Sequence, residues 1–290
     1  RLSRGLGDVY KRQIPDNVCF MENIRFFNGE NDNDKNLSEQ IAKAFDVYVM
    51  DAFATAHRTA ASTFGAIKFS KNACSGLLFS EEIKNLESAL KENKQILSIV
   101  GGSKISTKLK VIHNLLPNSS AIVVGGGIAN TFLKAAGNPI GKSMVEDDML
   151  DKAKELLSTN KIVLPKHVYV AETSQSNKVD LIPVEDVPEN QMILDIELNE
   201  NKISQNEEYI IWNGPLGIFE IDKFSNGTKQ LIAFLENSKS KVIAGGGETL
   251  FAINKFSDTS KFHYVSTAGG AFLEYLSGNK LPSIEALRLK

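Results

Sequence analysis

The sequence has little cysteine, no long apolar run and almost no net charge. Its two cysteines, Cys19 and Cys74, lack CxxC partners, which argues against a disulfide scaffold or a thiolate metal site. No apolar run reaches membrane-spanning length, and the opening residues lack the hydrophobic segment of a secretory signal. The 33 basic and 35 acidic residues nearly cancel, which leaves no polybasic surface. These absences predict a cytoplasmic protein without nucleic-acid or membrane partners.

Apolar residues make up 42% of the 290 residues, enough for a substantial core at a length where single cores divide. We therefore expect two lobes. From residue 95 onward, short β-rich runs end in glycines and open onto amphipathic helices, which is the pattern of βαβ units. This pattern predicts the α/β fold class, with a parallel sheet flanked by helices. Residues 171–205 are polar and are expected to form surface strands and turns.

Glycine-containing turns follow the expected strands at residues 101–104, 125–127, 213–217, 245–249 and 266–270. Because parallel strands end at the same edge of a sheet, these turns should converge around one crevice. Glycine lets backbone N–H groups approach a phosphate, and a following helix N-terminus adds positive potential. A single βα turn also needs glycine for tight packing, but several turns at one edge favour an anion site.

Two better-known phosphate motifs fail in this sequence. Residues 137–143 (GNPIGKS) have three residues between their glycines where a Walker loop has four, and we interpret them as an exposed turn. Residues 125–130 (GGGIAN) have Asn130 where the dinucleotide fingerprint has its third glycine, and no acidic residue ends the next expected strand. A nicotinamide-dependent dehydrogenase is therefore disfavoured.

Three charged side chains stand where these turns lead into helices. Lys104 and Lys108 are spaced to share one face of a helix's first turns, where two cations oppose the helix dipole. This arrangement suggests that an anionic ligand offsets the cost, although a solvated helix face is the alternative. Glu248 follows three glycines and could hold Mg²⁺, directly or through water, or satisfy the N–H groups of the next helix.

Several strings of the sequence resemble the phosphoglycerate kinase family, in the order that this family has them. They are ENIRF at 22–26, DAFATAHR at 51–58, GGSKISTK at 101–108, GGGIANTFL at 125–133, IGKS at 140–143, WNGPLGIFE at 212–220, GGGET at 245–249, VSTAGGA at 265–271 and GNKLPSIEAL at 278–287. The resemblance covers residues 14–290. It implies two Rossmann-like lobes, each built on a parallel sheet with flanking helices.

The resemblance also implies how the chain is divided. Residues 14–89 would be the remnant of an N-terminal domain for 3-phosphoglycerate, 90–265 the nucleotide-binding domain, and 266–290 a tail that crosses back. Residues 1–13 (RLSRGLGDVYKRQ) resemble translated linker sequence and are expected not to be native. The family's opening strand, with its catalytic arginine, has no counterpart before Ile14. We therefore expect an incomplete N-terminal lobe and no activity from this chain alone.

The implied activity is reversible phosphoryl transfer between 1,3-bisphosphoglycerate and ADP, giving 3-phosphoglycerate and ATP, by a monomeric enzyme that uses Mg²⁺. Such a transfer gathers negative charges, which lysines and backbone donors can neutralise. A nucleotide-binding fragment without turnover is the alternative from another class. An unrelated sugar kinase or dehydrogenase is the second alternative, and the failed fingerprints count against it.

The resemblance assigns roles to individual residues. Lys104 and Lys108 would be catalytic, with Lys104 on the transferring phosphoryl group and Lys108 also on nucleotide phosphate. Arg25 and Arg58 would grip 3-phosphoglycerate through their guanidinium groups. The expected nucleotide contacts are Lys108, Asn213, Glu220, Gly246, Gly247, Glu248 and Thr249, with Glu248 also on Mg²⁺. Met50, Ala54 and Glu248 depart from the asparagine, glycine and aspartate that the family usually has there.

Overall fold

The computed structural model describes residues 18–90, 95–203 and 206–290, so the expected leader at 1–13 lies outside the described residues. The chain divides into two compact units. Unit 1 comprises the described part of Arg1–Ser80 together with Lys280–Lys290, and unit 2 comprises that of Glu81–Asn279. The two units therefore divide at residues 80 and 279, whereas the resemblance implies boundaries near 89 and 265.

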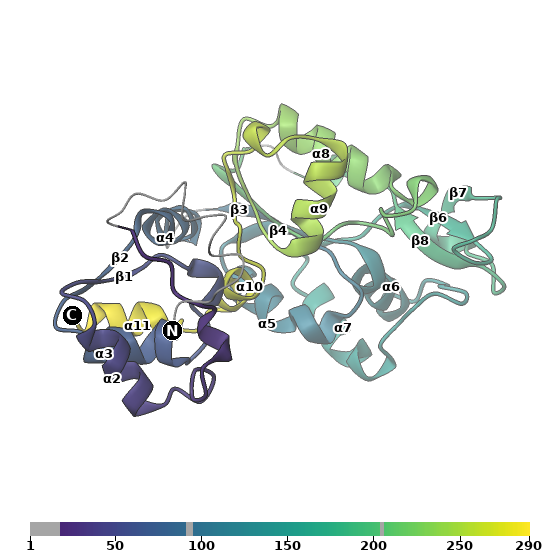
Figure 1. Cartoon of the computed structure of the whole chain (residues 1–290). Helices are drawn as coiled ribbons and strands as arrows, with labels where there is room; N and C mark the ends of the chain where they lie inside the picture. Colours follow the sequence, from purple (N-terminus) through teal and green to yellow (C-terminus); the bar gives the residue numbers. More distant parts are fainter. Residues whose placement is uncertain (1–17, 91–94, 204–205) are drawn as a thin grey trace. The chain divides into compact units, whose positions relative to one another are not determined.

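Unit 1 contains a small parallel sheet made of β1 (Tyr48–Met50) and β2 (Ala73–Ser75). The C-terminal helix α11 packs against α3, as the yellow and dark ribbons of Figure 1 show. Ser283 fastens this helix, because its Oγ donates to the carbonyl of Thr63 at 2.7 Å. The helices of unit 1 are α2 (Lys35–Lys43), α3 (Ala66–Phe69), α11 (Pro282–Arg288), the first residues of α4 (Leu77–Leu90), and short turns at Ile24–Phe26, Phe53–Thr55 and Ala61–Gly65.

Unit 2 is built on a six-stranded parallel sheet with the order β11-β10-β9-β3-β4-β5. β3 and β9, side by side, are buried at every position, as expected of Ile- and Val-rich strands covered on both faces. The expected α/β fold with a parallel sheet is therefore confirmed. The strands are β3 (Ile96–Val100), β4 (Ser119–Val124), β5 (Ile162–Val163), β9 (Tyr209–Asn213), β10 (Lys241–Ala244) and β11 (Tyr264–Val265).

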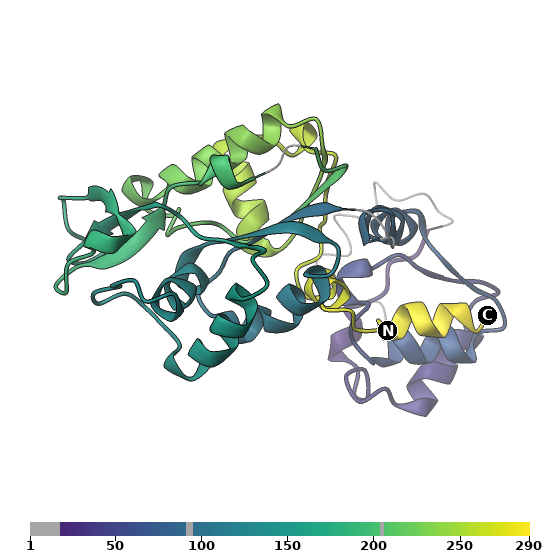
Figure 2. The same cartoon turned by 180° about the vertical axis from the view of Figure 1, so that it is seen from behind.

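Helices cover both faces of this sheet. Figures 1 and 2 show α8 and α9 on one face and α5, α6 and α7 on the other. This distribution follows from the strand order, because right-handed crossovers that move in opposite directions from β3 and β9 lie on opposite faces. The helices are α5 (Ile105–Leu115), α6 (Gly126–Ala135), α7 (Leu150–Leu157), α8 (Asn226–Asn237), α9 (Gly247–Phe256) and α10 (Gly270–Leu276).

A second, antiparallel sheet of unit 2 has the order β7-β6-β8. Its strands are β6 (His167–Ala171), β7 (Asp180–Pro183) and β8 (Met192–Ile196). The glycine segment 137–143 packs on it, because Ser143 Oγ accepts a hydrogen bond from the Ile193 N–H at 2.8 Å. Ile140 and Ser143 are buried, so the interpretation of this segment as an exposed turn is wrong for these two residues.

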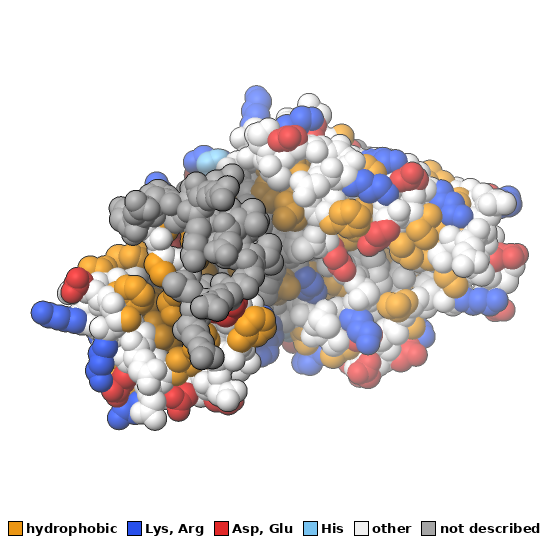
Figure 3. Space-filling view, in the orientation of Figure 1, with side chains coloured by type: hydrophobic (Ala, Val, Ile, Leu, Met, Phe, Trp, Pro, Cys, Tyr) orange, Lys and Arg blue, Asp and Glu red, His pale blue; other side chains and the backbone are white. Residues whose placement is uncertain are grey.

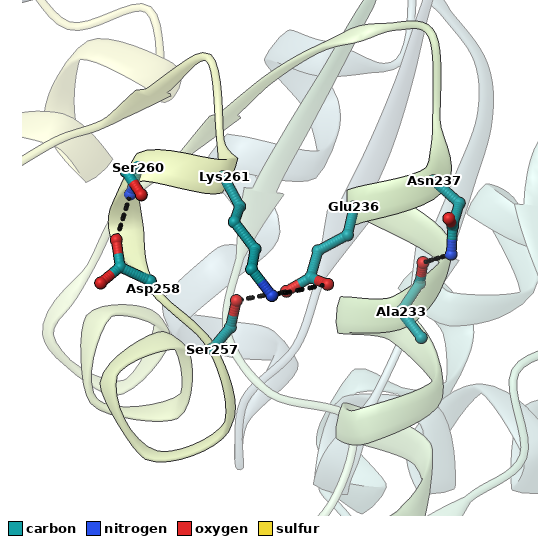
Figure 4. Close-up of polar contacts among 7 residues, drawn as sticks. All are labelled: Ala233, Glu236, Asn237, Ser257, Asp258, Ser260 and Lys261. Atoms are coloured by element: carbon teal, nitrogen blue, oxygen red, sulfur yellow. Dashed lines mark hydrogen bonds and ion pairs between the residues drawn. The ribbon is translucent and has the colours of Figure 1, made fainter.

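The C-terminal ends of α8 and α9 are tied together by one carboxylate, drawn in Figure 4. Both oxygens of Glu236 lie 3.2 Å from Lys261 Nζ, and Ser257 Oγ donates a hydrogen bond to Glu236. The hydrogen bond from Ser257 lowers the pKa of Glu236, and the ion pair with Lys261 adds to this. Asp258 caps the short helix that follows by accepting from the Ser260 N–H at 2.8 Å.

The surface seen in Figure 3 carries acidic and basic side chains side by side on both units. This mixture matches the near-zero net charge of −2. Across the described ranges, every helix is too short or too polar to cross a membrane.

Candidate functional site

The loops at the carboxyl ends of β3, β4, β9 and β10 meet where the strand order reverses, between β3 and β9. The Gly101 N–H donates to the carbonyl of Asn213 at 2.9 Å, and the Gly126 N–H donates to that of Leu216 at 2.8 Å. The Ile128 N–H reaches the carbonyl of Gly102 at 3.1 Å. These contacts confirm the expected convergence for the turns that follow β3, β4 and β9.

The glycines in these loops meet two different requirements. At Gly101 an added Cβ would stand 1.9 Å from the carbonyl oxygen of Pro215, and at Gly127 it would stand 2.1 Å from that of Ser103. These glycines are needed because backbone packs on backbone. Gly247 differs, since no described residue comes within 4 Å of its Cβ position apart from its chain neighbours and the backbone of its own helix. The open space therefore lies at the N-terminus of α9.

A cavity of about 380 Å³ opens beside these loops, within the size range of small-molecule sites. Its wall is largely apolar along β8 and along the loop that follows β9. Two exposed carboxylates, Glu220 and Glu248, also line it. The apolar lining consists of Met144, Met192, Ile193, Leu194, Ile196, Pro215, Leu216 and Ile218. Such a mixture suits a ligand with a flat apolar part and a polar part.

Lys108 lies in the first turn of α5, partly buried, and its Nζ donates a hydrogen bond to Asn213 Oδ1. Asn213 is buried at the end of β9, and its Nδ2 donates to the carbonyl of Gly245 at 2.7 Å. Burial lowers the pKa of Lys108 to about 8, although the charge of Glu248 acts in the opposite direction. A cation in this partly dry position attracts anions more strongly than one in water.

Lys104 stands before α5 rather than within it. Its backbone is extended (φ −133°, ψ 127°) at the N-cap position, so the expectation that Lys104 and Lys108 share a helix face is wrong. A lysine side chain cannot accept a hydrogen bond from the free N–H groups of the helix. That role falls to Glu146, whose carboxylate accepts from the Ser106 N–H at 2.9 Å and from Ser106 Oγ at 2.6 Å.

Glu146 places a negative charge of the chain itself at the N-terminus of α5, beside the position where the sequence predicts an anionic ligand. Desolvation acts to raise its pKa, but hydrogen bonds from Ser106 and Ile105, with the charge of Lys104, outweigh it and lower the pKa. Glu146 follows Ser106 by 40 residues, so no local pattern could have identified it. One free N–H group at the N-terminus of α5 is therefore satisfied by a carboxylate of the chain itself.

The residues at the start of α9 divide into open and buried positions. Gly246 has φ +103°, a conformation that favours glycine, and its Cβ position lies 2.6 Å from Asn213 Nδ2. Glu248 is exposed, whereas Thr249 is buried and its Oγ1 accepts from the Gly214 N–H at 2.8 Å. Thr249 thus fixes the loop after β9, while Gly247 and Glu248 face open space.

The two predicted arginines belong to unit 1, whereas the cavity belongs to unit 2. Arg25 and Arg58 are both exposed. The Arg25 N–H donates to Asn23 Oδ1 at 3.0 Å, and the Arg58 N–H donates to the carbonyl of Thr55 at 3.0 Å. Short backbone turns therefore present each guanidinium to solvent.

Comparison with known proteins identifies the family. The family model described as "Phosphoglycerate kinase" matches residues 6–279, a range that begins inside the segment expected to be a leader. A phosphoglycerate kinase of Francisella philomiragia is 48% identical, over 94% of this chain and 72% of its own length. One of Francisella tularensis subsp. tularensis is 47% identical, with the same two coverages.

Solved structures agree with these relatives. The structure of phosphoglycerate kinase from Coxiella burnetii has a TM-score of 0.87 and 44% identity, over 92% of this chain and 72% of that one. That of phosphoglycerate kinase from Pyrococcus horikoshii has a TM-score of 0.78 and 28% identity, over 92% and 71%. With the parallel sheet, the converging glycine loops and the order of the sequence strings, these matches lead to one conclusion: the chain belongs to the phosphoglycerate kinase family.

Proposed function

We propose that this protein acts in reversible phosphoryl transfer between 1,3-bisphosphoglycerate and ADP, which gives 3-phosphoglycerate and ATP in glycolysis, and that unit 2 binds the nucleotide. One observation carries the proposal within this family. The partly buried ammonium of Lys108 is held by Asn213 at the end of β9, at the sheet edge where the open N-terminus of α9 and the cavity also lie. In a nucleotide, the base would lie against the apolar wall, the sugar would meet a carboxylate and the phosphates would meet the cation.

In this proposal the phosphates lie at the start of α9. Free N–H groups and the positive end of the helix dipole at Gly246 and Gly247 favour an anion there. Lys108 adds a full positive charge, and Asn213 orients it. Glu220, which lines the cavity, takes the ribose hydroxyls. The glycine turns of β3 and β4 serve packing more than phosphate contact.

Lys104 is proposed to stabilise the phosphoryl group as it moves. It is exposed and carried by extended backbone beside the Gly102 turn, outside the helix that holds Lys108. Charge develops on the phosphoryl oxygens in a loose transition state, and a cation at this point lowers the barrier. Thr249 supports the site from within by fixing the Gly214 loop.

Magnesium fits this site only as a companion of the nucleotide. Among the described residues no group of three His, Cys, Asp or Glu side chains gathers as a protein cage for a metal. Mg²⁺ is usually held by one or two carboxylates together with phosphates and water, and Glu248 at the start of α9 supplies one exposed carboxylate. When bound, the ion would neutralise charge on the phosphates.

Unit 1 is proposed to bind 3-phosphoglycerate through Arg25 and Arg58, because exposed guanidinium groups can contact carboxylate and phosphate in pairs. In this proposal unit 1 forms the substrate domain, unit 2 forms the nucleotide domain, and Lys280–Lys290 is the segment that returns to unit 1. We further propose a monomeric protein of the cytoplasm.

Calorimetric titration of the chain with Mg-ADP tests the nucleotide site, and titration with NADH provides the comparison. We expect Mg-ADP to bind and NADH to bind more weakly, and we expect Lys108→Met to reduce the affinity for Mg-ADP. A coupled assay with both substrates then tests turnover. Because no turnover is expected of this chain alone, its absence agrees both with the proposal and with the alternative of a non-catalytic nucleotide-binding fragment, whereas turnover would exclude that alternative. Preferential binding of NADH would contradict the proposal.

A further inference from the structure

The loop that carries Glu220 to the cavity is fastened to α9 along its length. At its start the Gly214 N–H donates to Thr249 Oγ1 at 2.8 Å. In its middle the buried ring of Phe219 meets Phe251 and Phe256 of α9 edge to face, with ring centres 5.4 and 6.4 Å apart. The helix that begins at the proposed phosphate site therefore also determines where this loop lies.

The end of the loop is held by a single ammonium group. Lys255, in the last turn of α9, donates from Nζ to the carbonyls of Phe219 at 3.1 Å and Glu220 at 3.0 Å. The same Nζ lies 2.8 Å from Asp222 Oδ1. The two carbonyls belong to the peptide units on either side of the Glu220 Cα, so a single donor that holds both restricts the backbone of Glu220.

The ion pair by itself explains little of this arrangement. Asp222 is 81% exposed, and exposed ion pairs contribute little to stability. The Lys255 side chain is only 27% exposed and reaches inward to the backbone. Two hydrogen bonds from a charged donor to backbone carbonyls are stronger than neutral ones, and they act on the residue that lines the cavity.

We propose that Lys255 is a positioning residue for nucleotide recognition. By holding the Phe219 and Glu220 carbonyls, it fixes the direction from which the Glu220 carboxylate meets the sugar of the nucleotide. It thereby sets the preference for a ribose over a sugar without hydroxyl groups, because hydrogen bonds weaken steeply when their angle is lost. This inference rests on the proposed nucleotide site in unit 2.

The chain provides a matched control in Lys229 of α8. Its Nζ lies 5.1 Å from the centre of the Phe256 ring, and Lys255 Nζ lies 5.2 Å from the same centre. Replacing either lysine by methionine removes a cation from this ring. Only the replacement of Lys255 removes the two hydrogen bonds to the loop carbonyls.

The test compares the affinities for Mg-ADP and Mg-2′,3′-dideoxy-ADP by calorimetry on the chain. A hydrogen bond to a charged group corresponds to roughly tenfold or more in affinity, so the parent chain should prefer ADP by about that factor. Glu220→Gln and Lys255→Met should each bring the preference to about threefold or less. The double variant should match Glu220→Gln alone, because both changes remove one interaction. Lys255→Arg and Lys229→Met should keep the parent preference.

The possible outcomes separate the inference from the proposed function. If the parent chain fails to bind Mg-ADP, the proposed function fails. If it binds and Lys255→Met keeps the parent preference, or weakens both nucleotides equally, the positioning role is refuted. Should Lys255→Met fail to fold by circular dichroism, Lys255→Leu, which also lacks a donor for the two carbonyls, takes its place in the same comparison, with the same outcomes deciding.

Discussion

The lowered pKa of Lys108 makes nucleotide binding depend on pH. Burial lowers this pKa from 10.5 to about 8 in the free chain. A nucleotide phosphate beside the ammonium favours its charged form and raises the pKa again. Above about pH 8, binding should therefore take up a proton, and affinity should fall as the pH rises.

The size of the effect follows from the fraction of charged lysine. With a pKa of about 8, roughly nine tenths of the free chains carry the charge at pH 7 and roughly one tenth at pH 9. Because the bound state needs the charge, affinity for Mg-ADP should fall about tenfold between these pH values, or about 1.4 kcal/mol. The contribution of Lys108 to the stability of the free chain rises with pH instead. The folded pKa lies below the unfolded one, so this group's contribution to stability is full above about pH 10.5 and is lost as the pH falls through about 8.

Titration calorimetry at pH 7, 8 and 9 measures the affinity for Mg-ADP. Repeating it in buffers of different ionisation enthalpy gives the number of protons taken up on binding. Lys108→Met should bind more weakly at pH 7 and lose most of the pH dependence. Lys110→Met provides the control, because Lys110 is exposed on the same helix, and it should behave as the parent chain. A parent affinity that is constant from pH 7 to 9, or equal proton uptake in Lys108→Met, would refute the reasoning.

Four further substitutions concern stability. Gly126→Ala should lower the free energy of unfolding by about 1–3 kcal/mol, because φ is +63° and the Cβ would lie 2.6 Å from a carbonyl oxygen. Gly247→Ala, in open space, should keep the parent urea midpoint but bind Mg-ADP more weakly; equal midpoints for the two variants would contradict the geometry. Burial raises the pKa of Asp195 to about 7 from 3.8, so its contribution to stability is full below about pH 3.8 and is lost as the pH rises through about 7. In Asp195→Asn, the free energy of unfolding measured with urea should fall less between pH 5 and pH 8 than it does in the parent chain. An equal fall would show that Asp195 does not cause this pH dependence. Glu236→Gln removes the ion pair with Lys261 and should lower the free energy of unfolding by about 0.5–1 kcal/mol without changing the affinity for Mg-ADP. A changed affinity would show that this ion pair influences the nucleotide site.

The parallel sheet of unit 2 could be predicted because its information is local. Val- and Ile-rich runs that end in glycine and lead into an amphipathic helix define each βα unit within a short stretch of sequence. The antiparallel sheet was expected only as surface strands and turns, since its strands pair across the polar turns between them.

The site could be predicted in part. The contact between Lys108 and Asn213 joins two turns that were both expected at the same sheet edge. Glu146 and Lys255 were missed, because each acts through contacts with segments distant in sequence, 40 residues away for Ser106 and 35 for Glu220. Charged side chains on exposed segments carry no periodic signal of such a role. The role of each glycine could not be predicted either, because it depends on neighbours in space. The Cβ position of Gly127 lies against backbone, whereas that of Gly247 is open.

The return of the chain to unit 1 has a consequence for the order of folding during synthesis. Ser283 is hydrogen-bonded to Thr63, which lies 220 residues earlier in the sequence. Lys290 Nζ donates to the carbonyl of Ser70, which is also 220 residues earlier. Unit 2 lies within one uninterrupted segment, 81–279, and can gather its sheet as soon as that segment has left the ribosome. Unit 1 must wait for the last residues to be made, so the unit that is translated first completes its contacts last. During that interval the surface that α11 covers is open to chaperones and to neighbouring chains.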